Sequence, residues 1–140
     1  MTIKFRNYNG QGDYARISEF LIRHHQPGNL DGNWIEPAWE YMHFHPALEP
    51  SHLGRIGIWE DGGEIAAVCH YEWHLGEAFF QFHPAYRRLR RDMLNYAENN
   101  LGGVSSGDGR KYLCVYVNNN DEEFVSLVKE HGYKRDPEGD

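Results

Sequence analysis

Apolar and polar positions along the chain form patterns that predict strands and helices in turn. Residues 3–8 alternate with period two, which is typical of a strand with one buried face. From residue 14 to residue 25 the apolar positions recur on one helical face, and Asp13 precedes them as the expected N-cap. A second, short helix is expected to carry Trp39 and Met42, with Pro37 in its first turn.

The middle of the chain predicts an antiparallel meander. Strands are expected over residues 55–60, 65–74 and 78–82, which are rich in apolar and aromatic residues. Asp-Gly-Gly at residues 61–63 is a strong hairpin signal between the first two strands. Leu-Gly-Glu at residues 75–77 is expected to turn the second strand into the third.

The C-terminal part predicts a helix, a strand and a last helix. The first of these helices has a buried stripe made of Leu89, Met93, Tyr96, Ala97 and Leu101. Residues 112–117 form a continuous apolar run, which is typical of a strand covered on both faces. The last helix ends at Gly132 and buries Phe124, Leu127, Val128 and His131.

Composition and charge narrow the class of protein. The chain has 140 residues, 40% of them hydrophobic and 25% charged, which indicates one globular domain. Its net charge of −7 argues against nucleic acid as a partner. The apolar runs are far shorter than the roughly 18 residues of a membrane span, and the N-terminus has no apolar signal block. We therefore expect a soluble, cytoplasmic protein that binds no membrane.

Two stretches of the chain resemble a known family. Residues 83–98 read as a strand that turns sharply into a helix, with four arginines around Leu89. Residues 118–133 read as an Asn-rich turn, a helix and a glycine stop. In order and spacing these stretches resemble the GCN5-related N-acetyltransferase (GNAT) family. The succession of predicted elements matches that family over nearly the whole chain.

The resemblance implies an α/β (α+β) fold with a mixed, mainly antiparallel sheet and helices on both faces. Its cofactor cleft would form where the strands at residues 78–82 and 112–117 splay apart, near Gln81 and Tyr116. The family normally adds one or two further strands to the sheet. We therefore expect residues 1–140 to be a single GNAT-like domain that lacks the final strands. It could be the N-terminal unit of a longer tandem protein.

The resemblance also implies acetyl-CoA as co-substrate. The family binds its pyrophosphate on a glycine-rich turn, but the matching residues 87–92 contain no glycine. Four arginines there crowd a helix N-terminus, which disfavours cations, and a bound phosphate would relieve this. The alternative is a solvated basic turn. The cofactor-binding candidates are Gln81, Phe82, His83, Arg87, Arg88, Arg90, Arg91 and Asn120.

The positions that carry general-acid chemistry in the family differ in this chain. The family's tyrosine on the last helix corresponds to Val128, which cannot donate a proton. The preceding small residue corresponds to Phe124, and the family's asparagine to Asp121, one residue beyond Asn120. The resemblance therefore implies either a variant site or an inactive one.

Candidate general bases are nevertheless present on the central strand. His70 and Glu72 alternate with His74 on one face, and either of the first two could take a proton from an amine through water. The same His-x-Glu-x-His pattern could hold a metal ion. No fixed ligand motif accompanies it, so we expect no metal. We select His70 and Glu72 as the candidate catalytic residues.

Two classes of function follow from these residues and from the resemblance. In the first, the protein is an acetyltransferase that moves an acetyl group from acetyl-CoA to a primary amine of a small molecule or peptide. In the second, it is a catalytically inactive GNAT-like domain that serves an active domain as a structural or ligand-binding partner. The apolar strand at residues 112–117 would leave an open sheet edge, which predicts a homodimer or pairing with a second GNAT domain.

Overall fold

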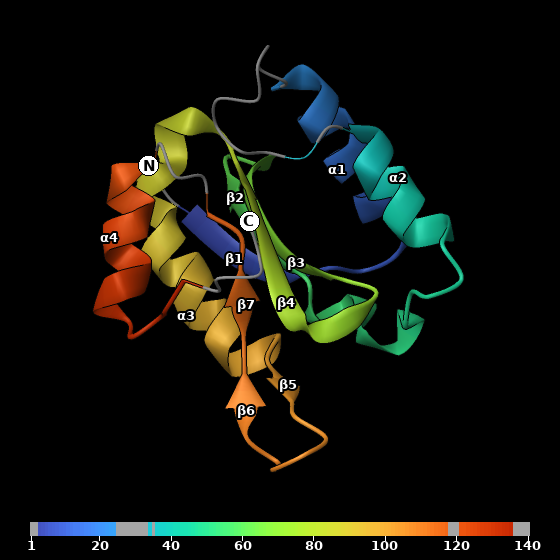
Figure 1. Ribbon diagram of the computed structural model, residues 1–140. Helices are drawn as coiled ribbons and strands as arrows, with labels where there is room; N and C mark the ends of the chain where they lie inside the picture. The colour runs from blue at the N-terminus through green and yellow to red at the C-terminus, as the bar shows by residue number, and fades with distance from the viewer. Residues whose placement is uncertain (1–2, 25–33, 35, 118–120, 136–140) are drawn as a thin grey trace.

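The computed structural model describes residues 3–24, 34, 36–117 and 121–135. Its centre is a five-stranded sheet in the order β1-β2-β3-β4-β7 (Figure 1). The strands are β1 (Ile3–Asn7), β2 (Gly57–Asp61), β3 (Glu64–Glu72), β4 (His74–Phe82) and β7 (Cys114–Val115). Only β4 and β7 pair in parallel, and the other neighbours are antiparallel. The predicted mixed, mainly antiparallel sheet is therefore confirmed.

Helices cover both faces of this sheet, as expected. Figure 1 shows α1 (Gln11–Arg23) and α2 (Glu36–Phe44) on one side, and α3 (Arg90–Asn100) and α4 (Glu122–Glu130) on the other. Two 3-10 helices, η2 (Pro50–Arg55) and η3 (Pro84–Leu89), precede β2 and α3. A small hairpin of β5 (Gly103–Val104) and β6 (Lys111–Tyr112) follows α3. Among the described residues no helix is long and apolar enough to cross a membrane.

The core has one layer on each face of the sheet. Towards α3, the Cys69 thiol lies 3.7 Å from the backbone carbonyl of Met93, and both residues are fully buried. Towards α2, the ring of Trp39 packs edge-on against that of His70 at 5.2 Å. Alternate residues of β3 therefore serve opposite layers, as the two-residue period of a strand requires.

The start of α1 differs from the prediction. The helix begins at Gln11 after Gly10, so Asp13 lies in the first turn and is not the N-cap. The Asp13 carboxylate instead accepts hydrogen bonds from the Arg6 guanidinium at 2.8 and 2.6 Å. Glu60 also pairs with Arg6, at 3.0 Å, and with Arg16, at 2.8 Å. This network ties β1, β2 and α1 together.

The turn between β3 and β4 also differs from the prediction. It lies at Trp73, which has a positive φ of 65°, and not at residues 75–77. Gly76 lies inside β4, where the Tyr112 ring packs on its backbone and a Cβ would lie 2.6 Å from the hydroxyl oxygen. His74 consequently belongs to β4, so the expected His70-Glu72-His74 face on one strand is wrong.

The apolar run at residues 112–117 is not one strand covered on both faces. It divides into β6 and β7, with Leu113 between them. Tyr112, Cys114 and Tyr116 are exposed, while the residues between them are half-buried. The chain therefore covers one face of the run only. β7 is an edge strand, and its pairing with a second strand stays a prediction.

Replacing Arg6 by Met should destabilise the fold by about 2 kcal/mol, because it leaves the buried Asp13 without its main partner. Arg6 lowers the pKa values of Asp13 and Glu60, so the stabilisation is present above roughly pH 4. It is lost as pH falls through the lowered pKa values, because the unfolded chain takes up those protons first. Chemical denaturation at several pH values measures both effects.

Arg23→Met is the matched control for this measurement. It removes an exposed pair with Glu19 on α1, which should change the free energy of unfolding by less than about 0.5 kcal/mol. Equal losses in the two variants would contradict a stabilising role for the Arg6 network.

Candidate functional site

The candidate site lies where β4 and β7 separate. The ladder between them contains only the pairs Glu77–Cys114 and Ala78–Val115. Beyond these pairs the two strands meet through side chains, because the ring of Phe79 stacks on that of Tyr116 at 4.9 Å. Pairing therefore ends before Gln81 and Tyr116, in agreement with the splay that the sequence predicted.

Two carboxylates near this junction, those of Glu72 on β3 and Glu77 on β4, are close enough to interact electrostatically. Burial and the charge of Glu77 raise the pKa of the half-buried Glu72, while nearby His45 lowers it. Burial and the charge of Glu77 raise the pKa of Tyr116. Within the described residues neither carboxylate forms an ion pair with Lys or Arg. Like charges on neighbouring strands destabilise a sheet, so packing alone does not account for this pair.

His70 lies on the α2 side of the sheet and is fully buried. Its Nδ1 must carry a proton, because it donates to the backbone carbonyl of Tyr71 at 2.8 Å. Its Nε2 then accepts from the Gln81 side-chain amide at 3.1 Å. The Gln81 oxygen in turn accepts from the backbone N–H of Trp34 at 2.7 Å. Burial lowers the pKa of His70 to about 4, so its imidazole is neutral, with both nitrogens occupied.

An aromatic wall flanks the two carboxylates. The indole of Trp73 stacks on His45 at 4.4 Å, and its buried N–H has no hydrogen-bond partner among the described residues. Tyr41 lies beyond His45, at 5.1 Å between ring centroids. A positive φ at a residue such as Trp73 is strained, and strain of this kind gathers at functional sites. Sequence reasoning did not identify Trp73 or His45 as site residues, because no local pattern signals a positive φ at tryptophan.

The arginine turn, which comprises residues 87–91, lies on the opposite face of the sheet, beside α3 and α4. η3 runs directly into α3, and Leu89 between them already has helical φ and ψ. No open loop of backbone amides is available there to surround a phosphate. Arg87 and Arg88 are exposed, and Arg88 lies over the Tyr86 ring at 5.4 Å. Exposed Arg91 pairs with Glu130 at 3.0 Å.

Arg90 differs from the other three arginines because its side chain is only 2% exposed. Its guanidinium lies over the rings of Phe82, at 5.3 Å, and Phe124, at 4.9 Å. Nη1 pairs with Asp121, while Nη2 is buried and has no hydrogen-bond partner among the described residues. Among the described residues Nη2 is thus an orphaned hydrogen-bond donor, which has a 3.5 Å ion pair with the exposed Glu123 instead.

The remaining cofactor-binding candidates are spread over both faces. Gln81 faces α1 and α2 and bonds His70, whereas Phe82 lies under Arg90. His83 accepts a hydrogen bond from the backbone N–H of Ala85 at 3.0 Å and so caps η3. Asn120 lies outside the described residues. Among the described residues no group of three or more His, Cys, Asp or Glu is arranged to hold a metal ion.

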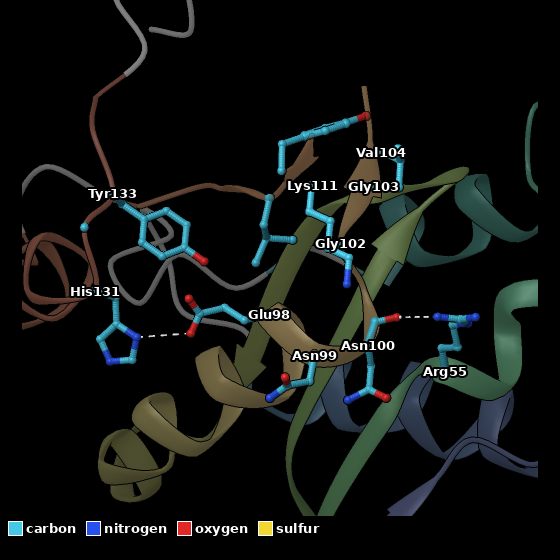
Figure 2. Close-up of a pocket in the computed structure, with 13 residues that line it drawn as sticks. Arg55, Glu98, Asn99, Asn100, Gly102, Gly103, Val104, Lys111, His131 and Tyr133 are labelled. Carbon is cyan, nitrogen blue, oxygen red and sulfur yellow. Dashed lines mark hydrogen bonds and ion pairs between the residues drawn. The ribbon is translucent and has the colours of Figure 1, made fainter. Parts of the chain in front are cut away.

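A pocket of about 430 Å³ lies at the other end of α3. It is away from two clusters beside β4, one around Glu72 and Glu77 and one around Arg90 and Asp121. Figure 2 shows Glu98 and His131 pointing toward each other at its wall, joined at 3.1 Å. Arg55 donates to the backbone carbonyl of Asn100 at 3.0 Å on another side. Its charged groups largely pair with one another or with the backbone. The pocket therefore offers less distinctive chemistry than the two clusters beside β4.

Comparison with solved structures supports the architecture. The crystal structure of the ribosomal-protein-S18-alanine N-acetyltransferase from Escherichia coli is similar, with a TM-score of 0.52 and 16% sequence identity. The alignment covers 96% of this chain and 79% of that one. No known family and no curated protein matches the sequence. The chain has a GNAT fold.

His70 should remain neutral until the pH falls to about 4, because burial disfavours its charged form. In the unfolded chain it should take up a proton near pH 6.5. The folded state therefore loses stability as pH falls from about 6.5 toward 4. An NMR titration of the imidazole measures the folded value, and the same titration in urea is the control. A midpoint near 6.5 in the folded protein would contradict this environment.

Proposed function

We propose that this protein is a GNAT-type N-acyltransferase that moves an acetyl group from acetyl-CoA to a primary amine of a small molecule or peptide. The observation that supports this most is the pair Glu72 and Glu77, whose carboxylates remain uncompensated where β4 and β7 separate. The GNAT fold provides the frame, and Glu72 provides a group that can accept a proton.

Glu72 would act as the general base. An alkylammonium has a pKa near 10.4 and must lose a proton before its nitrogen can attack a carbonyl. A carboxylate accepts that proton more readily when its own pKa is raised, and burial and Glu77 raise that of Glu72. The indole of Trp73 beside it suits an alkylammonium by cation–π attraction. His70, with both nitrogens occupied, would take no proton itself.

Acetyl-CoA would supply the activated acyl group as a thioester. Arg87, Arg88 and the orphaned Nη2 of Arg90 would hold its phosphates. β4 beyond Ala78 has no ladder partner in β7, so its backbone could pair with an extended ligand. The amine nitrogen would form the new C–N bond as the C–S bond of the thioester breaks. Val128 on α4 cannot donate a proton, so the CoA thiolate would leave as the anion and take its proton from water.

The second candidate is an inactive GNAT-like domain that serves an active partner. Two contacts are the observations behind it: Phe124 stacks on Phe80 at 5.3 Å, and Arg90 pairs with Asp121. These side chains fill the space between β4, α3 and α4. A domain that uses this space only for packing would bind no CoA.

Glu72→Gln should lower kcat at least about 100-fold, because an amide cannot accept the proton from the amine. Glu77→Gln should retain activity but shift the acid limb of the rate profile to lower pH. The sign follows because removing the charge of Glu77 lowers the pKa of Glu72, so Glu72 stays ionised in more acidic solution. Steady-state rates with acetyl-CoA and a panel of amines measure both effects.

Glu64→Gln is the matched control, because Glu64 is an exposed glutamate at the other end of β3. It should leave the rate and its pH profile unchanged. Full activity in Glu72→Gln, or no acetylation of any amine by the wild-type chain, would refute the proposed function.

A further inference from the structure

Arg90 requires an anion, and the folded chain satisfies that requirement only in part. It is the first residue of α3, and its side chain is 2% exposed between two aromatic rings. A buried cation is costly unless an anion and hydrogen bonds compensate it. Asp121 contacts Nη1 alone. Nη2 forms an ion pair with Glu123 at 3.5 Å, but the Glu123 side chain is 74% exposed, and Nη2 has no hydrogen-bond partner among the described residues.

Asp121 reaches Arg90 from the N-terminus of the other helix on this face. One of its oxygens caps α4 by accepting the backbone N–H of Phe124 at 3.2 Å, while the other accepts from Arg90. The N-terminus of α4, which favours negative charge, and the guanidinium at the start of α3 therefore meet at this carboxylate. A carboxylate of the chain itself thus occupies an anion position built by α3, α4 and Arg90.

The same contact holds α4 against β4. Phe124 is three residues beyond Asp121, and its ring stacks on Phe80 at 5.3 Å. The Arg90 guanidinium lies over Phe124 on the other side. Releasing Asp121 would therefore loosen Phe124 as well, and it would open the space between β4, α3 and α4.

We infer that Asp121 is an internal competitor for the phosphates of CoA, which must displace it from Arg90 to bind. This inference rests on the proposed function. A phosphate can bond Nη1 and Nη2 together, which Asp121 does not do. Ligands with phosphates should therefore bind, whereas an acylated pantetheine without them should not release Asp121. The Arg90–Asp121 pair thus makes phosphate binding a condition for opening the space between β4, α3 and α4.

Asp121→Asn tests this directly. Asparagine caps a helix as well as aspartate does, so α4 should keep its start while the competing charge is removed. Titration calorimetry with CoA, without any acceptor, should show affinity about tenfold tighter than that of the wild type. Thermal unfolding of the variant checks that it is folded. Arg90→Lys in the Asp121→Asn background should lose the gain, because an ammonium lacks the planar fork that bonds two phosphate oxygens.

Glu130→Gln is the matched control. It breaks the Arg91 pair, which also joins α3 to α4 but is exposed on both sides, and CoA affinity should stay within about twofold. The inference is overturned if Asp121→Asn binds CoA no tighter than the wild type, if Glu130→Gln gains as much, or if no variant binds CoA. Tighter binding by Asp121→Asn without acetylation would support the inference and count against the proposed catalysis.

Discussion

Strand β4 is paired with β7 over only two positions. The cluster around Glu72 and Glu77 and the cluster around Arg90 and Asp121 both lie beside β4 and depend on that short ladder. Alternate side chains of a strand point to opposite faces, so β4 sends Glu77, Phe79 and Gln81 one way and Phe80 and Phe82 the other. On the first face the side chains meet Glu72, Tyr116 and the buried histidine. On the second face they meet α3 and α4. One strand therefore connects a candidate base to a candidate anion site.

The protein compensates its buried charges in one region and leaves them uncompensated in another. Asp13 and Glu60 share Arg6 and Arg16, and both carboxylates have lowered pKa values. Half-buried Glu72 pairs with no Lys or Arg among the described residues, and its pKa is raised. The first arrangement stabilises the join between α1 and the sheet. The raised pKa of Glu72 means that its charged form costs stability. Carboxylates with pKa values shifted in this way are often found at binding or catalytic sites.

The order and type of most elements could be predicted from the sequence, because hydrophobic periodicity and the Asp61–Gly63 turn are local signals. The turn between β3 and β4 could not, because Gly76 is required by the Tyr112 ring that packs on it from a distant strand. The separation of strands at the site was predicted by family resemblance. The aromatic wall was not, because it depends on a strained Trp73 that no local pattern indicates.

The arginine turn shows why a run of like charges says little until each side chain is placed. Four adjacent arginines predict one phosphate-binding cluster, yet Arg91 pairs with an exposed glutamate and Arg90 is buried beside Asp121. Helical geometry separates them, because neighbouring positions on a helix point about 100° apart. Asp121 lies 31 residues further along the chain, so no local pattern reveals the pair. The positive charge of this turn is thus partly compensated inside the fold, because a carboxylate of the chain already pairs with the most buried of the four arginines.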